Sequence, residues 1–486
     1  MVIGALALSG CASLYFRDAG PPPAPVRYEL GALPFSDYWK CIIFNGEKIG
    51  FSHLAVSRLP AAPPRYEIRA EAAFSLRFLG IEKKVVLRSR DVVREDLTLV
   101  EFDYGYHIDG SDLRVTGRHD AGSLTATIVT GGRPSEQRLA AEGAVYPSSA
   151  IALYPVVHGL VPGRDYRYRV YSGELQQLAD VEQRVVAYQA SELFTGNAFK
   201  VETSMHGQGS TTWFDHQGKP LLELALRGVM ISALEDEDSA KRYVAVGAMN
   251  RKDTLVEFGL IRPDVAIERP RSVSTLRVAL AGVERSPPSG VNQRCLKDGT
   301  EAVCEIRGAV VETVAADSVA ATRARYLRSS VTVQSRDPAV TRLAVEIAGG
   351  VPPEQQVARI LGWLDANVEK APLDVFSALD VLEKRKAECQ GHAYLYTALA
   401  RASGIPTRVV NGLAYSADLN GFLYHSWAEI LIGSDWIAVD PTFGQTAADA
   451  THIRLVEGEQ LADLVPLLDW VGRARIRVLA VEHQQR

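Results

Sequence analysis

The fold of the C-terminal third of this chain is decided by two stretches, ECQGHAYLYTALARASGIPTR at 388–408 and YHSWAEILIGSDWIAVDPTFG at 424–444. The first contains a run rich in Ala and Leu from Ala393 to Ser403, with no Pro or Gly inside it, and Gly-Ile-Pro follows directly. This pattern predicts a helix that ends near Ser403. The second stretch has two β-rich runs around a turn that contains Gly433, which predicts a β-hairpin.

These predicted elements carry three side chains suited to nucleophilic catalysis. Cys389 lies at or just before the first turn of the helix, where unpaired N–H groups and the helix dipole favour an anion. We therefore expect the pKa of this thiol to be lowered. His425 lies on the first arm of the hairpin and Asp440 at the end of the second. An imidazole can take the proton of a thiol, and a carboxylate can orient the imidazole.

Alternatives exist for each of the three residues taken singly. A lone buried Cys is usually inert, a lone His on a strand is usually a packing residue, and Asp before Pro-Thr is usually a turn or cap. Counted from the turn, Asp440 is a few residues nearer to it than His425, so the two are predicted to be diagonal neighbours. All three residues, in this order and on these elements, favour a catalytic triad with Cys389 as the nucleophile.

The blocks ECQGHA, LARASGIPTRVV, YHSWAE and WIAVDPTFG resemble the transglutaminase-like superfamily, a branch of the papain-like cysteine acyl-transfer fold. The resemblance covers roughly residues 340–456 and implies an α+β catalytic domain. It assigns the roles of nucleophile, general base and acid, and orienting carboxylate to Cys389, His425 and Asp440. Many relatives have Gly before the acidic residue that precedes the Cys, whereas this chain has Ala387, which leaves the loop less free to adopt positive φ.

The resemblance also implies the chemistry. A thioester would form on the Cys and be resolved by water or by an amine, and the substrate would be a protein or peptide amide. The expected oxyanion donor is the backbone N–H of Cys389, with Gln390 and Trp427 as candidate site-lining residues. No metal or organic cofactor is implied. Two alternatives remain open: a non-catalytic scaffold for binding or assembly, and a lipoprotein whose β-rich part carries a hydrophobic ligand.

Composition excludes little beyond nucleic-acid binding. The 486 residues are 47% hydrophobic and 23% charged, which is typical of a globular chain of several domains. The net charge of −5 gives no basic footprint for nucleic acid. The histidines of the first 250 residues are scattered and show no metal-ligand spacing. His392 and His452 lie near the catalytic blocks, and we expect structural roles for both.

The first eleven residues, MVIGALALSGC, resemble a bacterial lipoprotein signal that ends at a lipidated Cys11. The run is short and has no basic residues before it, so we expect the printed start to lie inside the true signal. The alternative is a frayed apolar terminus. Ala12 after the Cys favours an outer-membrane destination, and we expect a lipid-anchored protein of the cell envelope that faces the periplasm. No other apolar run approaches the ~18 residues that a membrane-spanning helix needs.

The remaining pattern predicts a multidomain chain, with N-terminal antiparallel all-β lobes followed by a C-terminal α+β domain. The predicted parts are a Pro-rich tether at 12–35, an antiparallel β domain at 36–250, a small β domain at 251–312, a connector at 313–336 and the catalytic domain at 337–486. Within the last part, helices are predicted after Pro352-Pro353 and over 461–471, and a final strand over 475–481.

Two further cysteines bracket a predicted hairpin turn. Cys295 and Cys304 flank LKDGTEAV, whose Asp-Gly pair is a turn signal. In an exported protein they could form a cross-strand disulfide, and two reduced cysteines are the alternative. Cys41, in the apolar run YWKCIIF, is expected to be buried and inert. The sequence does not predict an oligomeric state.

Overall fold

The computed structural model describes residues 15–22, 24–79, 81–283, 286–470 and 472–484. The predicted signal at 1–11, with Cys11, lies outside these residues. The chain divides into two compact units: a first unit of 1–107, 114–129 and 134–254, and a second unit of 108–113, 130–133 and 255–486. Within the described ranges, every helix is too short or too polar to cross a membrane.

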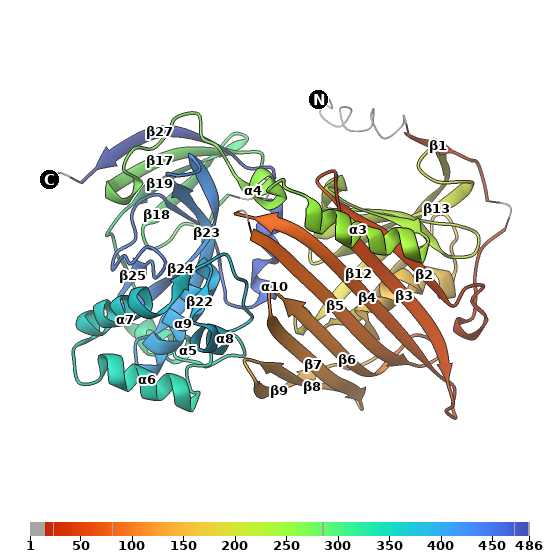
Figure 1. Ribbon diagram of the computed structural model, residues 1–486, viewed down its shortest axis with the longest axis horizontal. Coiled ribbons are helices and arrows are strands. Elements are labelled where there is room, and N and C mark those ends of the chain that lie inside the picture. Colours follow the sequence, from red (N-terminus) through yellow and green to blue (C-terminus); the bar gives the residue numbers. More distant parts are fainter. Residues whose placement is uncertain (1–14, 23, 80, 284–285, 471, 485–486) are drawn as a thin grey trace. The chain divides into compact units, whose positions relative to one another are not determined.

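The first unit is built on one large sheet, mostly antiparallel, of 16 strands (Figure 1). Strands β2 to β9 follow one another in both sequence and sheet, as do β10 to β16, and the two runs join where β16 pairs with β2. The strands are β1 (Phe16–Asp18), β2 (Asp37–Phe44), β3 (Glu47–Leu59), β4 (Arg65–Phe78), β5 (Ile81–Val93), β6 (Leu99–Ile108), β7 (Ser111–Asp120), β8 (Ser123–Thr130), β9 (Arg133–Ala140), β10 (Val145–Pro147), β11 (Asp165–Ser172), β12 (Gln177–Ser191), β13 (Asn197–Met205), β14 (Gln208–Phe214), β15 (Pro220–Ala225) and β16 (Met230–Glu235).

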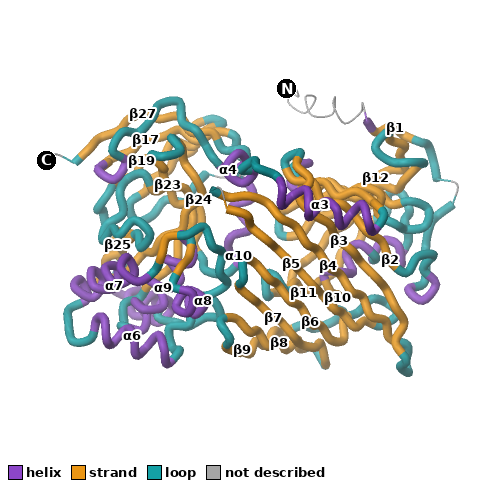
Figure 2. Tube along the Cα trace, in the orientation of Figure 1, coloured by secondary structure: helices purple, strands orange, loops and turns teal. Residues whose placement is uncertain are grey.

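Helices are few in the described part of the first unit. The longest, α3 (Glu237–Met249), packs across β2, β3 and β4 (Figure 2). It begins at Asp236, whose side chain accepts a hydrogen bond from the N–H of Ser239 and so caps the first turn. The others are α2 (Tyr154–His158) and the 3-10 turns η1 (Leu30–Ala32), η2 (Ser148–Ala152) and η3 (Leu226–Gly228).

The segment predicted to be a Pro-rich tether is part of the first unit from Tyr15 onward. Strand β1 pairs with β12, and Val26 forms an isolated β-bridge with Leu160. Val26 and Leu30 are buried in the main core of this unit. The prolines of 12–35 indicate an extended chain, and the described residues of this segment include the strand β1 and the 3-10 turn η1. Because apolar side chains lie among the prolines, burying them stabilises the segment against the first unit.

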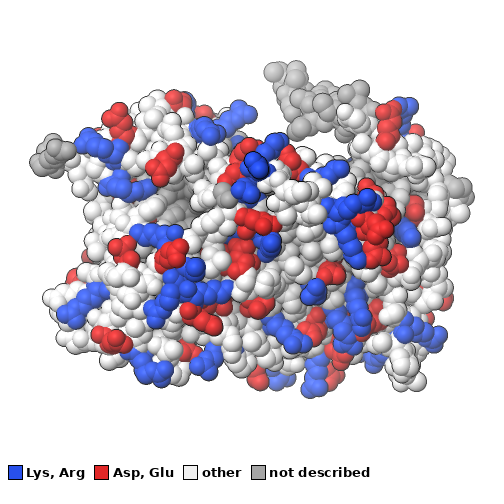
Figure 3. Space-filling view, in the orientation of Figure 1, with Lys and Arg blue, Asp and Glu red and all other residues white. Residues whose placement is uncertain are grey.

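Charged side chains of both signs are interspersed on the face shown in Figure 3. In the first unit many of them are cross-strand pairs: Arg88 lies 3.0 Å from Glu71, and an oxygen of Asp103 lies 2.7 Å from Arg114. Opposite charges on neighbouring strands stabilise the register of the sheet. Each exposed pair adds only about 0.2–1 kcal/mol.

The second unit places helices against a sheet of five strands. The sheet order is β20 (Glu312–Thr313), β25 (Asp435–Val439), β24 (Gly421–Ile432), β23 (Thr407–Ser416) and β26 (His452–Glu457). The central helix, α9 (Cys389–Ala402), contacts β23 and β24 and also the helices α6 (Pro338–Ala348), α7 (Pro353–Asn367) and α8 (Ala378–Lys384). Every residue of α9 from Gly391 to Arg401 is buried. This explains its Ala- and Leu-rich composition, because a helix surrounded on all sides has no polar face.

A second sheet completes this unit, in the order β18 (Gln293–Asp298), β19 (Glu301–Arg307), β17 (Val273–Ala281) and β27 (Arg475–His483). Cys295 and Cys304 face each other across β18 and β19 and form a disulfide with an S–S distance of 1.95 Å. Residues 251–312 were predicted to be a separate small domain. In the structure their strand β17 pairs with β27, the last strand of the chain, and the two share one core with the five-stranded sheet.

Smaller differences from the sequence prediction have local causes. The helix predicted over 461–471 is split into α10 (Leu461–Leu464) and the 3-10 turn η6 (Val465–Asp469). Pro466 lies in the first turn of η6, and its missing N–H ends the α-helical hydrogen bonding. The remaining elements are α4 (Thr254–Gly259), η4 (Pro270–Ser272), η5 (Ala316–Ser318), α5 (Val319–Tyr326), β21 (Glu369–Lys370) and β22 (Lys386–Ala387). Helix α5 lies inside the predicted connector.

Candidate active site

Cys389 is the first residue of α9, and its sulfur lies against strand β24. Glu388 caps the helix, because its side chain accepts a hydrogen bond of 3.1 Å from the N–H of Gln390. The thiol is half-buried, and the backbone N–H of Ser426 donates a hydrogen bond toward its sulfur. Ser426 is the neighbour of His425 in β24. The start of α9 therefore brings the predicted nucleophile to the strand that carries the predicted base.

His425 and Asp440 are in direct contact. Nε2 of His425 lies 2.8 Å from Oδ2 of Asp440, and both side chains are buried. Ala428 pairs with Val439 in the hairpin of β24 and β25, so Asp440 follows the last paired position and reaches His425 on the diagonal. Because a carboxylate only accepts, the hydrogen bond to Asp440 places a proton on Nε2. Nδ1 is then the ring nitrogen left to exchange a proton with the thiol.

Asp440 is held by more than its contact with His425. Its other oxygen accepts hydrogen bonds from the N–H groups of Thr442, at 2.7 Å, and Phe443, at 3.0 Å. These bonds come from the turn that Asp-Pro-Thr forms after β25. Burial alone would raise the pKa of Asp440, but the hydrogen bonds and positive charge at His425 and His452 hold this pKa far below its ordinary value. Asp440 is therefore a fixed, ionised acceptor.

A second imidazole shares the same carboxylate oxygen. Nε2 of His452 also lies 2.8 Å from Oδ2 of Asp440, while its Nδ1 lies 3.0 Å from the backbone oxygen of Asp449 and 3.3 Å from that residue's carboxylate. Both ring nitrogens thus face acceptors, so both carry protons and His452 is an imidazolium. Burial opposes this charge, but the hydrogen bonds to Asp440 and Asp449 raise the pKa of His452 to about 9.

The network continues to the surface through Arg271 of η4. Its guanidinium lies 2.8 Å from the carboxylate of Asp449 and stacks on the ring of Phe443, 3.8 Å from its centroid. The ring of Phe443 in turn stacks on His425, with centroids 4.7 Å apart and planes at 11°. Asp449, with Arg271 behind it, therefore holds His452, and Phe443 packs on His425.

These supporting residues were not identified from the sequence, and His452 was expected to be structural. Asp449 and His452 lie three residues apart, just after the Asp-Pro-Thr turn, and this spacing is a local signal that could have paired them. Arg271 gives no such signal, because 178 residues separate it from Asp449. His392, the other histidine near the catalytic blocks, is buried in α9, and its Nδ1 lies 3.0 Å from the backbone oxygen of Glu388.

The prediction of a lowered pKa for Cys389 is wrong for this structure. Burial raises the pKa of the thiol well above its ordinary value, and the negative charge of Glu388 raises it further, while the N–H of Ser426 acts in the opposite direction. The sulfur lies 3.2 Å from Oε2 of Glu388 and donates its proton there. The helix dipole is present as expected, but a full charge next to the sulfur outweighs a partial one.

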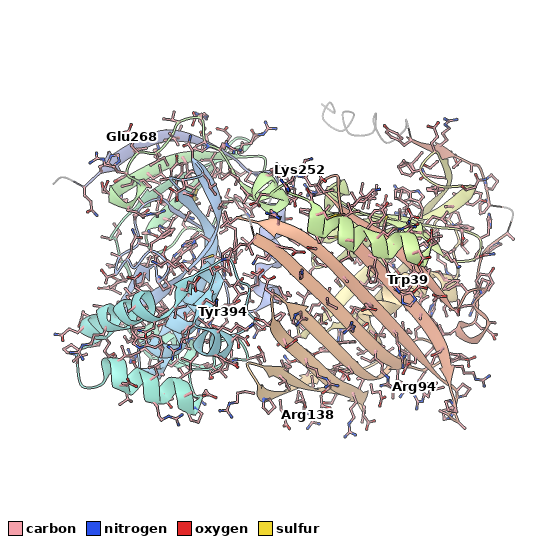
Figure 4. The ribbon with its side chains drawn as sticks, in the orientation of Figure 1. Trp39, Arg94, Arg138, Lys252, Glu268 and Tyr394 are labelled. Atoms are coloured by element: carbon pink, nitrogen blue, oxygen red, sulfur yellow. A yellow bond between two sulfur atoms is a disulfide. The ribbon has the colours of Figure 1, made fainter. Side chains whose placement is uncertain are left out.

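The two predicted site-lining residues, Gln390 and Trp427, make different contacts. Gln390 donates a hydrogen bond to the hydroxyl of Tyr394, which lies one turn further along α9 (Figure 4). The indole of Trp427 is buried and packs edge-on against His452, with ring centroids 5.3 Å apart. Trp427 therefore supports the second imidazole. No contact identifies it, or Gln390, as an oxyanion donor, and that role stays a prediction.

Three of these side chains could also hold a metal ion. The ligand atoms of His425, Asp440 and His452 all lie within 4.8 Å of one another. Each of the three atoms is already used in the hydrogen bonds described above, and the imidazolium form of His452 has no lone pair to offer. A metal thus fits this arrangement poorly, and the expectation that no metal or organic cofactor is needed stays a prediction.

Comparison with known proteins supports the family assignment of this region. Residues 341–441 match the sequence model of the transglutaminase-like superfamily. No curated protein matches the chain. The matched segment runs from α6 through β25 and ends just after Asp440, so it includes all three residues of the predicted triad.

Solved structures show weaker similarity. A proposed cysteine protease from Cytophaga hutchinsonii is 18% identical, over 44% of this chain and 89% of its own, with a TM-score of 0.31. A beta-barrel-like protein of a domain of unknown function from Brucella abortus is 8% identical, over 41% of this chain and 95% of its own, with a TM-score of 0.30. A proposed protease from Parabacteroides distasonis is 12% identical, over 82% and 71%, with a TM-score of 0.19.

The predicted fold class, β-rich N-terminal lobes followed by an α+β domain, is confirmed. Helix α9 carries Cys389 and the hairpin of β24 and β25 carries the other two residues, which is the order that the sequence motifs indicate. The second unit of this chain therefore contains a domain of the transglutaminase-like superfamily, at residues 341–441.

Proposed function

We propose that the protein is a cysteine-dependent acyl-transfer enzyme that acts on protein or peptide amides. The proposal rests on the contact of 2.8 Å between His425 and Asp440, together with the hydrogen bond that the N–H of Ser426, the neighbour of His425, donates to the sulfur of Cys389. A cysteine, an imidazole and an orienting carboxylate are the groups that thiol acyl transfer needs. The supporting network of His452 and its partners holds the imidazole in one orientation.

In the proposed reaction, Nδ1 of His425 takes the proton of Cys389, and the sulfur attacks the amide carbonyl. The tetrahedral intermediate collapses when its C–N bond breaks, and His425 returns the proton to the departing amine. A thioester remains on the sulfur. Water or a second amine then attacks it, His425 takes a proton from that nucleophile, and breakage of the C–S bond regenerates the thiol.

Hydrolysis and transamidation are separated by the second nucleophile, and one experiment measures both. The full chain is incubated with a glutamine-rich protein, with and without a fluorescent primary amine. Incorporation of the amine reports transamidation, release of ammonia without incorporation reports side-chain deamidation, and mass spectrometry detects cleaved peptide bonds. Cys389→Ala is the control and should lose each of these products together with the thioester adduct. Products that persist in this variant would refute the proposal.

A non-catalytic scaffold is the second candidate, and the raised pKa of Cys389 favours it. A thiol that stays protonated is a poor nucleophile. Labelling with iodoacetamide distinguishes the two candidates, because Cys41 is the other free cysteine of the described residues and is buried. An active enzyme should be alkylated at Cys389 faster than a free thiol of the same pKa. A scaffold should show no such acceleration.

We also propose that the protein is exported and anchored in the cell envelope through a lipid on Cys11, with its substrate protein or peptide in the periplasm. The disulfide of Cys295 and Cys304 supports export, because structural disulfides persist in oxidising compartments. Metabolic labelling with palmitate should mark the wild-type protein and should be lost in Cys11→Ser. Equal labelling of both proteins would refute the anchor.

A further inference from the structure

The first unit contains a cavity of about 370 Å³ that is open to solvent and shares no residue with the cysteine site. Along the strands, side chains that point into the cavity alternate with side chains that point away from it, because residues two apart point to the same side of a sheet. Tyr38 and Lys40 of β2 and Tyr104 and Tyr106 of β6 line it, for example, whereas Trp39 lies beside α3, where Lys241 covers its ring (Figure 4). The volume lies within the range of small-molecule sites.

The wall combines apolar and polar side chains. Lys40 lies 2.7 Å from Glu223, so this pair contributes no net charge. Glu71 and Arg88 lie in register with His53 and Trp39, so their side chains, 3.0 Å apart, point to the opposite face of the sheet. Hydroxyl groups make up much of the polar part of the wall: Ser52, Ser89, Ser148, Ser149, Thr203, Ser210 and Thr212. An acyl chain would remove these groups from water without replacing their hydrogen bonds, which makes a lipid a poor ligand here.

One carboxylate of the wall has no partner. Glu174 lies in the turn between β11 and β12, and its side chain forms neither a hydrogen bond nor an ion pair with any described residue. Surrounding protein raises its pKa, and the side chain remains exposed to solvent at the rim of the cavity. The cavity therefore carries one uncompensated negative charge, and every described cation on its wall is already paired.

Two tyrosines lie against the turn that carries this carboxylate. A Cβ added to Gly173 would lie 2.0 Å from the ring of Tyr104 and 2.8 Å from the hydroxyl of Tyr106, so the turn is pressed onto both side chains. Burial raises the pKa of Tyr106, and the negative charge of Glu174 adds to this effect. A carboxylate beside tyrosine rings is the chemistry that recognises an ammonium group, through charge and cation–π attraction.

We propose that this cavity binds a small organic ammonium compound, whose cationic group lies between Glu174 and the ring of Tyr106. The hydroxyl-rich wall would take the polar remainder of the ligand. An anionic ligand is disfavoured, because the ammonium group of Lys40 is engaged with Glu223. The proposal concerns the first unit alone and does not depend on the activity of Cys389.

The test measures binding of three ammonium probes to the full chain by calorimetry, each against a neutral counterpart. The pairs are choline with 3,3-dimethylbutanol, ethanolamine with ethylene glycol, and glucosamine with glucose. We expect at least one ammonium probe to bind at millimolar concentration or below, and its neutral counterpart to bind at least about tenfold more weakly.

Glu174→Gln should weaken the binding of that probe by at least about tenfold, because the charge-assisted contact is lost. Glu182→Gln is the matched control, since Glu182 lies on β12 and does not line the cavity. Tyr106→Phe keeps the ring, so it should retain binding, and Tyr106→Leu should lose it. Failure of all three ammonium probes to bind, or unchanged binding in Glu174→Gln, would overturn the proposal.

Discussion

Burial and, after it, the charge of Glu388 raise the pKa of the Cys389 thiol, so removal of this charge should make the sulfur more reactive. The change Glu388→Gln keeps a side-chain oxygen that can cap α9. The carboxylate oxygen lies 3.2 Å from the sulfur. Coulomb's law at this distance gives about 1.3 kcal/mol in water and about 5 kcal/mol at an effective dielectric constant of ~20. Because both side chains are half-exposed, the lower end applies, and the pKa of the thiol should fall by about one to two units.

The assay is the rate of alkylation by iodoacetamide between pH 6 and pH 10, with the rate of Cys389→Ala subtracted. At a pH below both pKa values, a fall of one unit gives about ten times more thiolate. The control is Glu383→Gln, an exposed glutamate of α8. If the midpoint of the Glu388→Gln profile stays unchanged or rises, the electrostatic explanation fails. If the two glutamine variants shift equally, the effect is one of net charge and not of the local contact.

Three further predictions concern the second unit. Folding raises the pKa of His452 to about 9. Its contribution of about 3 kcal/mol to the free energy of unfolding is therefore present below pH ~6.5 and is lost as the pH rises through 9. Urea unfolding should show this loss in the wild-type protein and should not show it in His452→Gln. Asp440→Asn should lower acyl-transfer activity by about 10²–10⁴-fold through the wrong tautomer of His425, and equal activity would remove Asp440 from the mechanism. Replacing Cys295 and Cys304 by Ala should lower the free energy of unfolding by about 2–3 kcal/mol in chemical denaturation, and an unchanged midpoint would contradict a stabilising disulfide.

The sequence was sufficient for the parts of the site that are local. The position of Cys389 at a helix start and the diagonal relation of His425 and Asp440 both follow from counting residues within one helix and one hairpin. The pattern of alternating strands likewise predicted the β-rich N-terminal part, because period-two alternation is a property of each strand alone.

Properties that depend on distant or competing groups were missed. The thiol pKa is set by burial and by Glu388, which oppose the helix dipole, and the sequence does not show which effect is larger. Arg271 reaches Asp449 only in the folded chain. The tether prediction depended on Pro content alone and overlooked the apolar side chains of Val26 and Leu30, which the core of the first unit buries.

The pairing of β27 with β17 has a consequence for biogenesis. Strand β27 lies almost 200 residues after β17 and borders it along nearly its whole length. If the chain enters an envelope compartment from its N-terminus, β17 has an open edge until residues 475–483 emerge. Open strand edges recruit other strands, so this interval is when the nascent chain is most exposed to aggregation and most in need of a chaperone.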